Sequence, residues 1–220
     1  MQRTVIKNSE LEEWRSILEM GVFIECVFKR VKHVFTQRKK FQTSYGNYKQ
    51  FIEEYMPVYK YLKHIYKSDE DVLYRHVGVG NQPYDGEIKK KKIVSRIEIG
   101  YPILGKEAYL RSLELIDKGS VVHLYDKEYF QKIREVILET AKKKAIKVYD
   151  ETWLLIYYPF VEQLYPGDTG LPEEEFSNLI EELRSITYKT RKVDFFVPSF
   201  QYNNYLGSQI KPERLYRIKE

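Results

Sequence analysis

Two acidic residues, Asp85 and Glu98, have the spacing in this chain that points most clearly to chemistry. They lie in the segment 82–100, QPYDGEIKKKKIVSRIEIG. If this segment folds as a tight antiparallel hairpin centred between Lys91 and Lys92, residues whose numbers add up to 183 face each other. Asp85 then faces Glu98, and two like charges with Cβ atoms about 5 Å apart are unfavourable unless something compensates them. The usual compensators are a shared proton or a bound cation, and Mg²⁺ prefers carboxylate oxygens, so the pair predicts a metal site.

The same register places cations beside the two acids. Glu87 faces Arg96, which is a favourable pair of opposite charge. Lys89 shares a strand face with Asp85, and Arg96 shares one with Glu98. The alternative interpretation is that Asp85 caps a turn and Glu98 is an exposed strand residue paired to a lysine. Short acidic motifs arise easily, so the sequence leaves both interpretations open.

The composition fits one large domain, or one domain with a helical extension. The 220 residues are 43% hydrophobic and 31% charged, which is ordinary for a soluble globular protein. A net charge of +5 is compatible with a polyanionic partner without demanding one. Cys26 is the only cysteine, which excludes an intramolecular disulfide and a cysteine-based zinc site. No apolar run is long enough to span a membrane and the N-terminus lacks a signal-peptide core, so we expect a cytoplasmic protein with no membrane partner.

The spacing of apolar residues predicts an alternation of helices and strands. Helices are expected over about 9–35, 48–66, 108–118, 126–148 and from Pro172 onward. Strands are expected over 72–79, both arms of the hairpin, 153–158 and 193–197. Ser9 and Glu12 predict a capping box for the first helix, and Pro57 should kink or split the second. The order predicts an α/β fold in which helices flank a central mixed β-sheet.

This order of elements, with an Asp opening one strand and a Glu within the next, resembles the PD-(D/E)XK, or restriction-endonuclease-like, superfamily. In that pattern Pro-Asp is followed, after a variable gap, by Glu-x-Lys. The stretch Pro83-Tyr-Asp85 matches the first element with one residue inserted, and Glu98-Ile-Gly100 matches the second except at its last position. The segment 142–157 also resembles the helix-to-strand segment that follows the hairpin in many members.

The resemblance covers roughly residues 70–200 and implies a division of the chain. It implies an N-terminal helical region over 1–68, a nuclease-like core over 69–200 and a C-terminal tail over 201–220.

The resemblance also implies roles for individual residues. Asp85 and Glu98 would hold Mg²⁺ beside the scissile phosphate, and Lys89 and Arg96 would join them in the catalytic site. The family's lysine is Gly100 here, so either another cation has moved in or the site does not cut. Lys106, just beyond the strand, is a further candidate for that cation.

The sequence therefore supports more than one function. One is a Mg²⁺-dependent nuclease, or a catalytically degraded relative that still binds DNA or RNA. The alternative is a non-enzymatic interaction or assembly protein, and a homodimer is compatible with each of them.

Overall fold

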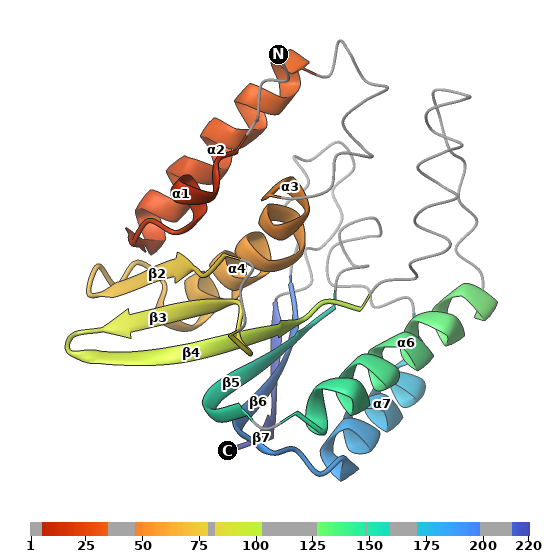
Figure 1. Ribbon diagram of the computed structural model, residues 1–220. Helices are drawn as coiled ribbons and strands as arrows, with labels where there is room; N and C mark the ends of the chain where they lie inside the picture. Colours follow the sequence, from red (N-terminus) through yellow and green to blue (C-terminus); the bar gives the residue numbers. More distant parts are fainter. Residues whose placement is uncertain are drawn as a thin grey trace. The chain divides into compact units, whose positions relative to one another are not determined.

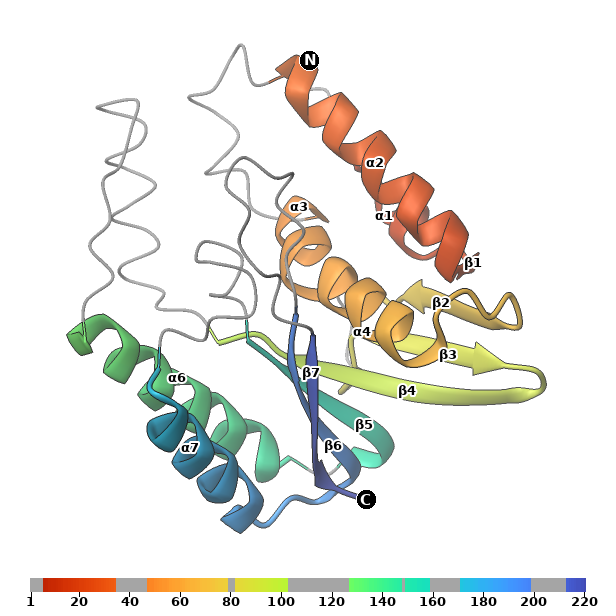
Figure 2. The same ribbon diagram turned by 180° about the vertical axis from the view of Figure 1, so that it is seen from behind.

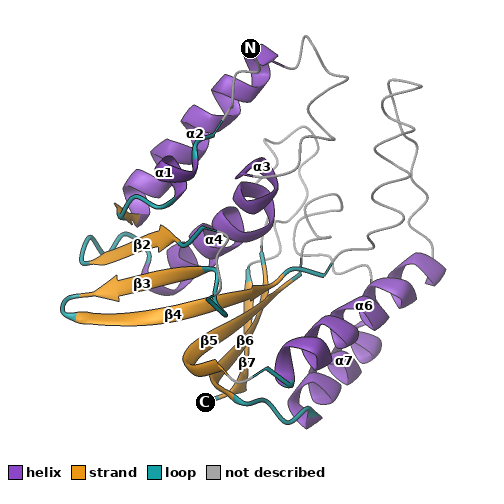
Figure 3. Cartoon of the chain, viewed as in Figure 1, coloured by secondary structure: helices purple, strands orange, loops and turns teal. Residues whose placement is uncertain are grey.

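The chain folds into α-helices and a mixed β-sheet. The computed structural model describes residues 6–34, 47–78, 82–102, 127–147, 149–158, 171–198 and 213–220. Seven strands, β1 to β7, follow one another in the sheet in chain order, with helices between them (Figure 1 and Figure 3). The predicted α/β class with a mixed sheet is confirmed. The predicted helix over 108–118 and the candidate Lys106 lie outside the described residues.

The chain divides into two compact units, and each is described by itself. The boundary falls within strand β4, between Ile97 and Glu98. The units are Met1–Ile97 with Gly105–Val122, and Glu98–Leu104 with His123–Glu220.

In the first unit, helical segments lead into an antiparallel meander of strands. Its elements are α1 (Asn8–Leu11), β1 (Arg15–Ser16), α2 (Ile17–Val34), α3 (Asn47–Gln50), the π-helix η2 (Phe51–Tyr55), α4 (Met56–Tyr66), β2 (Val72–His76), β3 (Gly86–Lys90) and most of β4 (Ile93–Gly100). The helical segment η2–α4 lies against one face of β2 and β3 in both views (Figure 1 and Figure 2). There the rings of Tyr55 and Tyr74 pack edge to face with centroids 5.5 Å apart.

The predicted capping box at Ser9 and Glu12 is wrong, because α1 begins at Asn8 and the Lys7 amide donates to the Glu10 carboxylate at its start. Helix α1 ends at Leu11, and the short strand β1 then pairs with β2 before α2 begins. A later Ser-x-x-Glu pattern, from Ser16 to Glu19, caps helix α2 instead. The Ser16 amide donates to the Glu19 carboxylate at 2.8 Å, and the Glu19 amide donates to the Ser16 hydroxyl at 3.3 Å.

The second helical region is split as predicted for Pro57, into the π-helix η2 and the α-helix α4. In η2, directly before Pro57, the Met56 amide donates to the Phe51 carbonyl. In a regular α-helix the Pro57 ring would clash with the carbonyl of Glu53, four residues earlier. The wider π turn accommodates this clash, and Pro57 itself stands in the first turn of α4.

The predicted register of the hairpin is confirmed over its described pairs. Gly86 faces Ile97 and Lys90 faces Ile93, so partner numbers add up to 183. The turn at Lys91 and Lys92 uses a left-handed backbone conformation at Lys91, with φ 56°. Along β4 the first half is largely exposed and the second half is buried.

The second unit packs two helices against a three-stranded sheet. Its elements are α6 (Lys127–Ala145), β5 (Tyr149–Tyr157), α7 (Glu173–Ser185), β6 (Thr190–Val197) and β7 (Arg214–Lys219). Strands β5 and β6 are parallel, whereas β7 runs antiparallel to β6. Side chains of both helices and all three strands form one apolar core, so the sheet has a helix-covered face. Strand β7 lies in the segment for which the sequence predicts only a tail.

Candidate functional site

Glu98 is a buried carboxylate that is neutralised by two lysines of its own unit. Its residue is 4% exposed, and the Lys144 ammonium on α6 donates to its carboxylate. The Lys147 Nζ lies 3.9 Å from the Glu98 Oε1. The lysine pairing considered for Glu98 is therefore present, but the expected exposure of that residue is wrong. Two ammonium groups thus supply the positive charge for which the sequence suggested Mg²⁺.

Gly100, where the family motif has lysine, is packed under the same helix. A Cβ at Gly100 would lie 3.3 Å from the Thr140 Cγ2 and 3.7 Å from Ile156. The first contact is tighter than ordinary packing, so a side chain at Gly100 would require Thr140 to shift by a few tenths of an ångström. Thr140 and Lys144 are one helical turn apart and lie over Gly100 and Glu98, respectively. The helix that covers Gly100 thus also contributes the lysine that pairs with Glu98.

Asp85 joins two strands of the first unit through its main chain. Its amide donates to the Ile97 carbonyl at 2.9 Å, and its carbonyl accepts from the Val77 amide at 2.9 Å. The Asp85 charge also helps to raise the pKa of Tyr74, although burial of that hydroxyl is the larger cause. Asp85 and Glu98 belong to different units, so their pairing around a metal stays a prediction. Among the described residues, no three His, Cys, Asp or Glu side chains are grouped to hold a metal ion.

Lys89 and Arg96 lie on an exposed face of the first unit. The predicted facing of Glu87 and Arg96 across the hairpin is confirmed. Glu87 binds Arg75 from the neighbouring strand, with the carboxylate 2.7 Å from the guanidinium. Because Arg75 occupies the carboxylate, the Arg96 guanidinium lies over the ring of Tyr84, 5.1 Å from its centroid.

These residues form a surface that we call the cation–aromatic face, comprising Trp14, Arg75, Tyr84, Lys89 and Arg96. The Arg75 guanidinium lies 4.8 Å and the Lys89 ammonium 5.9 Å from the centroid of the Trp14 ring. Both rings are half-buried, and Arg96 is exposed. Three cations on one face of the sheet, with a single carboxylate among them, favour an anionic ligand. The role of Trp14 could not be predicted from the sequence, because Trp14 reaches this face through the pairing of β1 with β2.

A second polar site, which sequence reasoning missed, surrounds His76 on the helix-covered face of β2. The residue is 1% exposed, and neither ring nitrogen has a hydrogen-bond partner among the described residues. The Glu54 Oε2, on the π-helix, is 3.5 Å from His76 Nε2, which is beyond a good hydrogen bond. Burial lowers the pKa of His76 to about 4, and the nearby Asp85 carbonyl opposes this shift only in part. His76 is therefore a neutral imidazole at physiological pH.

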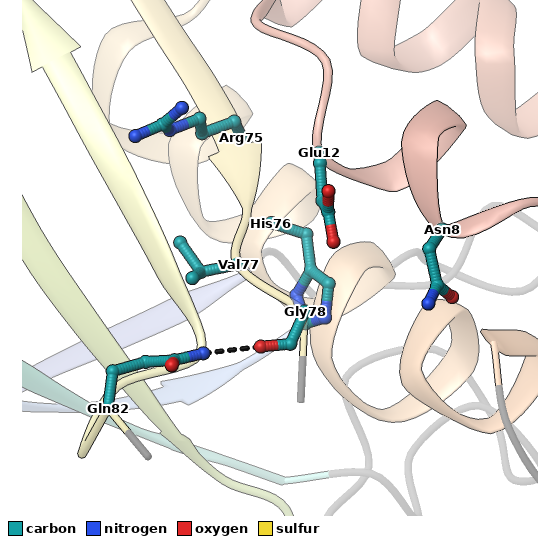
Figure 4. Close-up of a pocket in the computed structure, with 7 residues that line it drawn as sticks. All are labelled: Asn8, Glu12, Arg75, His76, Val77, Gly78 and Gln82. Atoms are coloured by element: carbon teal, nitrogen blue, oxygen red, sulfur yellow. Dashed lines mark hydrogen bonds between the residues drawn. The ribbon is translucent and has the colours of Figure 1, made fainter. Parts of the chain in front are cut away.

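An open pocket of about 380 Å³ adjoins this histidine (Figure 4). Its lining residues are Asn8, Glu12, Arg75, His76, Val77, Gly78 and Gln82. Figure 4 shows the side chains of Asn8 and Glu12 approaching His76 and Gly78 from the N-terminal segment, while Gln82 donates to the Gly78 carbonyl. The four histidines lack the spacing of metal ligands. The burial of His76 could have been predicted only from the alternation of β2, which places His76 on the same buried face as Tyr74.

No family model, curated protein or solved structure matches this chain. In the part of the chain that the structure describes, no helix has the length and apolar character needed to cross a membrane.

Proposed function

We propose that this chain binds DNA or RNA through the cation–aromatic face. We propose further that it is a divergent protein of restriction-endonuclease-like architecture whose former metal site is neutralised by lysines. The single observation that carries the proposal is the placement of three cationic side chains beside two half-buried aromatic rings on one sheet face.

Cations and aromatic rings complement the two parts of a nucleic acid. Lysine and arginine bind backbone phosphates, and each neutralised phosphate releases counterions. Aromatic rings stack on bases without strong sequence preference, which contributes about 1–3 kcal/mol per base. Arg75 is held in place by Glu87, so part of this surface is organised before any ligand arrives.

The environment of Glu98 supports binding rather than metal-assisted hydrolysis. A carboxylate that holds Mg²⁺ needs oxygen atoms open to the ion and to its water ligands. Glu98 is buried, and both Lys144 and Lys147 are directed at the same oxygen, Oε1. Displacing these two ammonium groups would leave them without their buried counter-ion, which opposes metal binding.

A metal-dependent nuclease is the second candidate, because one observation favours it. Lys144 contacts Glu98 and so places a cation beside this acid. The family motif has a lysine for this purpose at the position where this chain has Gly100. The two candidates differ in one measurement. Incubating DNA and RNA substrates with Mg²⁺ or Mn²⁺ should give no cleavage if the chain only binds. Cleavage that disappears in Asp85→Ala and Glu98→Ala would establish the nuclease instead.

Fluorescence anisotropy with labelled single- and double-stranded DNA and RNA tests the binding itself. The variant Lys89→Ala/Arg96→Ala should weaken binding and flatten the dependence of log Kd on log salt. The predicted loss of slope is about 0.7–0.9 for each phosphate contact removed. The matched control is Lys142→Ala/Lys143→Ala on α6, which removes the same charge from two exposed lysines and should leave binding unchanged. If the wild-type protein binds none of the four nucleic acids, the proposal is wrong and an interaction protein becomes the better account.

A further inference from the structure

The closed end of the β3–β4 hairpin exposes two aliphatic side chains. Ile93 is 71% exposed and Val94 is 50% exposed, although both are β-branched residues of a regular strand. Neighbouring strand residues point to opposite faces, so both faces of the ribbon are uncovered here. Adjacent exposed aliphatic groups at the end of a hairpin offer an apolar contact to a partner.

The turn that joins the two strands carries cations in an unfavourable backbone conformation. Lys91 has a φ of 56°, in the left-handed region that glycine or asparagine normally occupies. Neither Lys91 nor Lys92 makes an ion pair among the described residues. Lys90 does, because its Nζ lies 3.1 Å from the Asp69 Oδ2. The acidic segment 69–71 therefore neutralises part of the charge at this end, but the two turn lysines remain unpaired. Lys91 and Lys92 are both exposed, so their charges can reach an anionic ligand.

We propose that this tip, comprising Lys91, Lys92, Ile93 and Val94, is a wedge for double-stranded DNA. The lysines would bind phosphates on either side of the minor groove. The side chain of Ile93 or of Val94 would then insert between adjacent base pairs and kink the duplex, which is how minor-groove proteins use apolar wedges. This inference rests on the proposed function, because it names the duplex as the ligand and the tip as the element that deforms it.

Two observations favour DNA over an anionic membrane surface as the partner. First, the tip is continuous with the cation–aromatic face, because Val94 faces Lys89 across the hairpin and shares its strand face with Arg96. Second, two aliphatic side chains offer less apolar surface than one myristoyl chain, which alone gives only marginal membrane binding. A base-pair step needs only a single inserted side chain to unstack.

The test measures bending and unstacking by the full-length protein. A duplex labelled at both ends should show increased energy transfer when the wild-type protein binds, and a 2-aminopurine within the duplex should brighten as it unstacks. The variant Ile93→Ala/Val94→Ala should lose most of both signals while its affinity changes by no more than roughly threefold, since phosphate contacts supply most of the affinity. The control Ile146→Ala removes a residue of matching exposure, 72%, and should behave like the wild-type protein.

The outcomes separate this inference from the proposed function. If the wild-type protein binds the duplex without bending or unstacking it, the wedge is wrong and nucleic-acid binding stands. If it binds no nucleic acid, both fail. Co-sedimentation with phosphatidylserine vesicles that is lost in Ile93→Ala/Val94→Ala would assign the tip to membranes and overturn the wedge. Because the bending and 2-aminopurine signals are measured first on the wild-type protein, a misfolded variant cannot leave the question open.

Discussion

The Lys144 ammonium of α6 donates to the buried carboxylate of Glu98 in β4. A second buried acid of the same unit, Asp194, is also paired with two cations. The Lys192 Nζ lies 2.9 Å from its Oδ2, and the Arg217 Nε lies 2.9 Å from its Oδ1. In both places a carboxylate removed from water is paired with two cations, which is the condition for burying a charge. Glu98 thus behaves as part of the packing between α6 and the sheet.

Removing the Glu98 charge should therefore cost stability. Glu98→Gln leaves Lys144 and Lys147 without their counter-ion, but Lys144 is 22% exposed at its side chain and can still reach water. We expect a loss of about 1–2 kcal/mol in the free energy of unfolding, below the cost of breaking a fully buried pair. Thermal unfolding should show this as a Tm lower by roughly 2–8 °C. A double-mutant cycle with Lys144→Met should show coupling between the two sites, and an additive result would contradict the pairing.

Mg²⁺ should not stabilise the protein if lysines already neutralise Glu98. A ligand that binds only the folded state raises the apparent stability with its concentration. We expect the Tm to be the same in EDTA and in excess Mg²⁺ or Mn²⁺. A rise in Tm with the metal that is absent in Asp85→Ala would show that the predicted metal site exists.

Adding a side chain at Gly100 should strain the contact with α6. The added methyl of Gly100→Ala lies 3.3 Å from the Thr140 Cγ2, which is closer than ordinary packing. We expect a destabilisation of about 1 kcal/mol, at the lower end of overpacked cores. Thr140→Ala removes the opposing methyl, so Gly100→Ala/Thr140→Ala should recover part of the loss in urea unfolding. If the double variant is less stable than the sum of the two single losses, the packing argument is wrong.

The strengths and failures of the sequence prediction have physical causes. The hairpin register could be predicted because the turn fixes it once its centre is placed between Lys91 and Lys92, although lysines are poor residues for a tight turn. The lysine partner of Glu98 could not, because Lys144 is distant in sequence and its run of lysines also suits a helix C-terminus. Strand β7 was missed because nearly all of its residues are half-buried, so it shows little apolar contrast between its two faces. The site around His76 was missed because a single buried histidine forms no recognisable motif in the sequence.

The burial of His76 should make the protein less stable in mild acid. Its pKa of about 4 in the folded chain lies below the usual 6.5, so between these values the unfolded chain binds more protons. Stability should be full above about pH 6.5 and fall as the pH drops toward 4, by at most about 3 kcal/mol at 1.36 kcal/mol per unit. His76→Gln should show a smaller loss than the wild-type protein across this window in urea titrations. Identical pH profiles for the two proteins would contradict the assignment.

Trp14 should report nucleic-acid binding directly. The chain has two tryptophans, so Trp153→Phe leaves Trp14 as the only one. Stacking of a base on its ring should quench its fluorescence as nucleic acid is added. The control Trp14→Phe, which retains Trp153, should show no quenching. Quenching of Trp153 alone would move the binding surface to the other unit.

The most direct test of the central claim locates the bound nucleic acid on the chain. Ultraviolet cross-linking to a nucleic acid, followed by mass spectrometry of the digested protein, identifies the peptides in contact with bases. We predict cross-links at Trp14 or Tyr84, the two rings of the cation–aromatic face. Cross-links confined to other peptides, or none under conditions in which the nucleic acid is bound, would contradict the account.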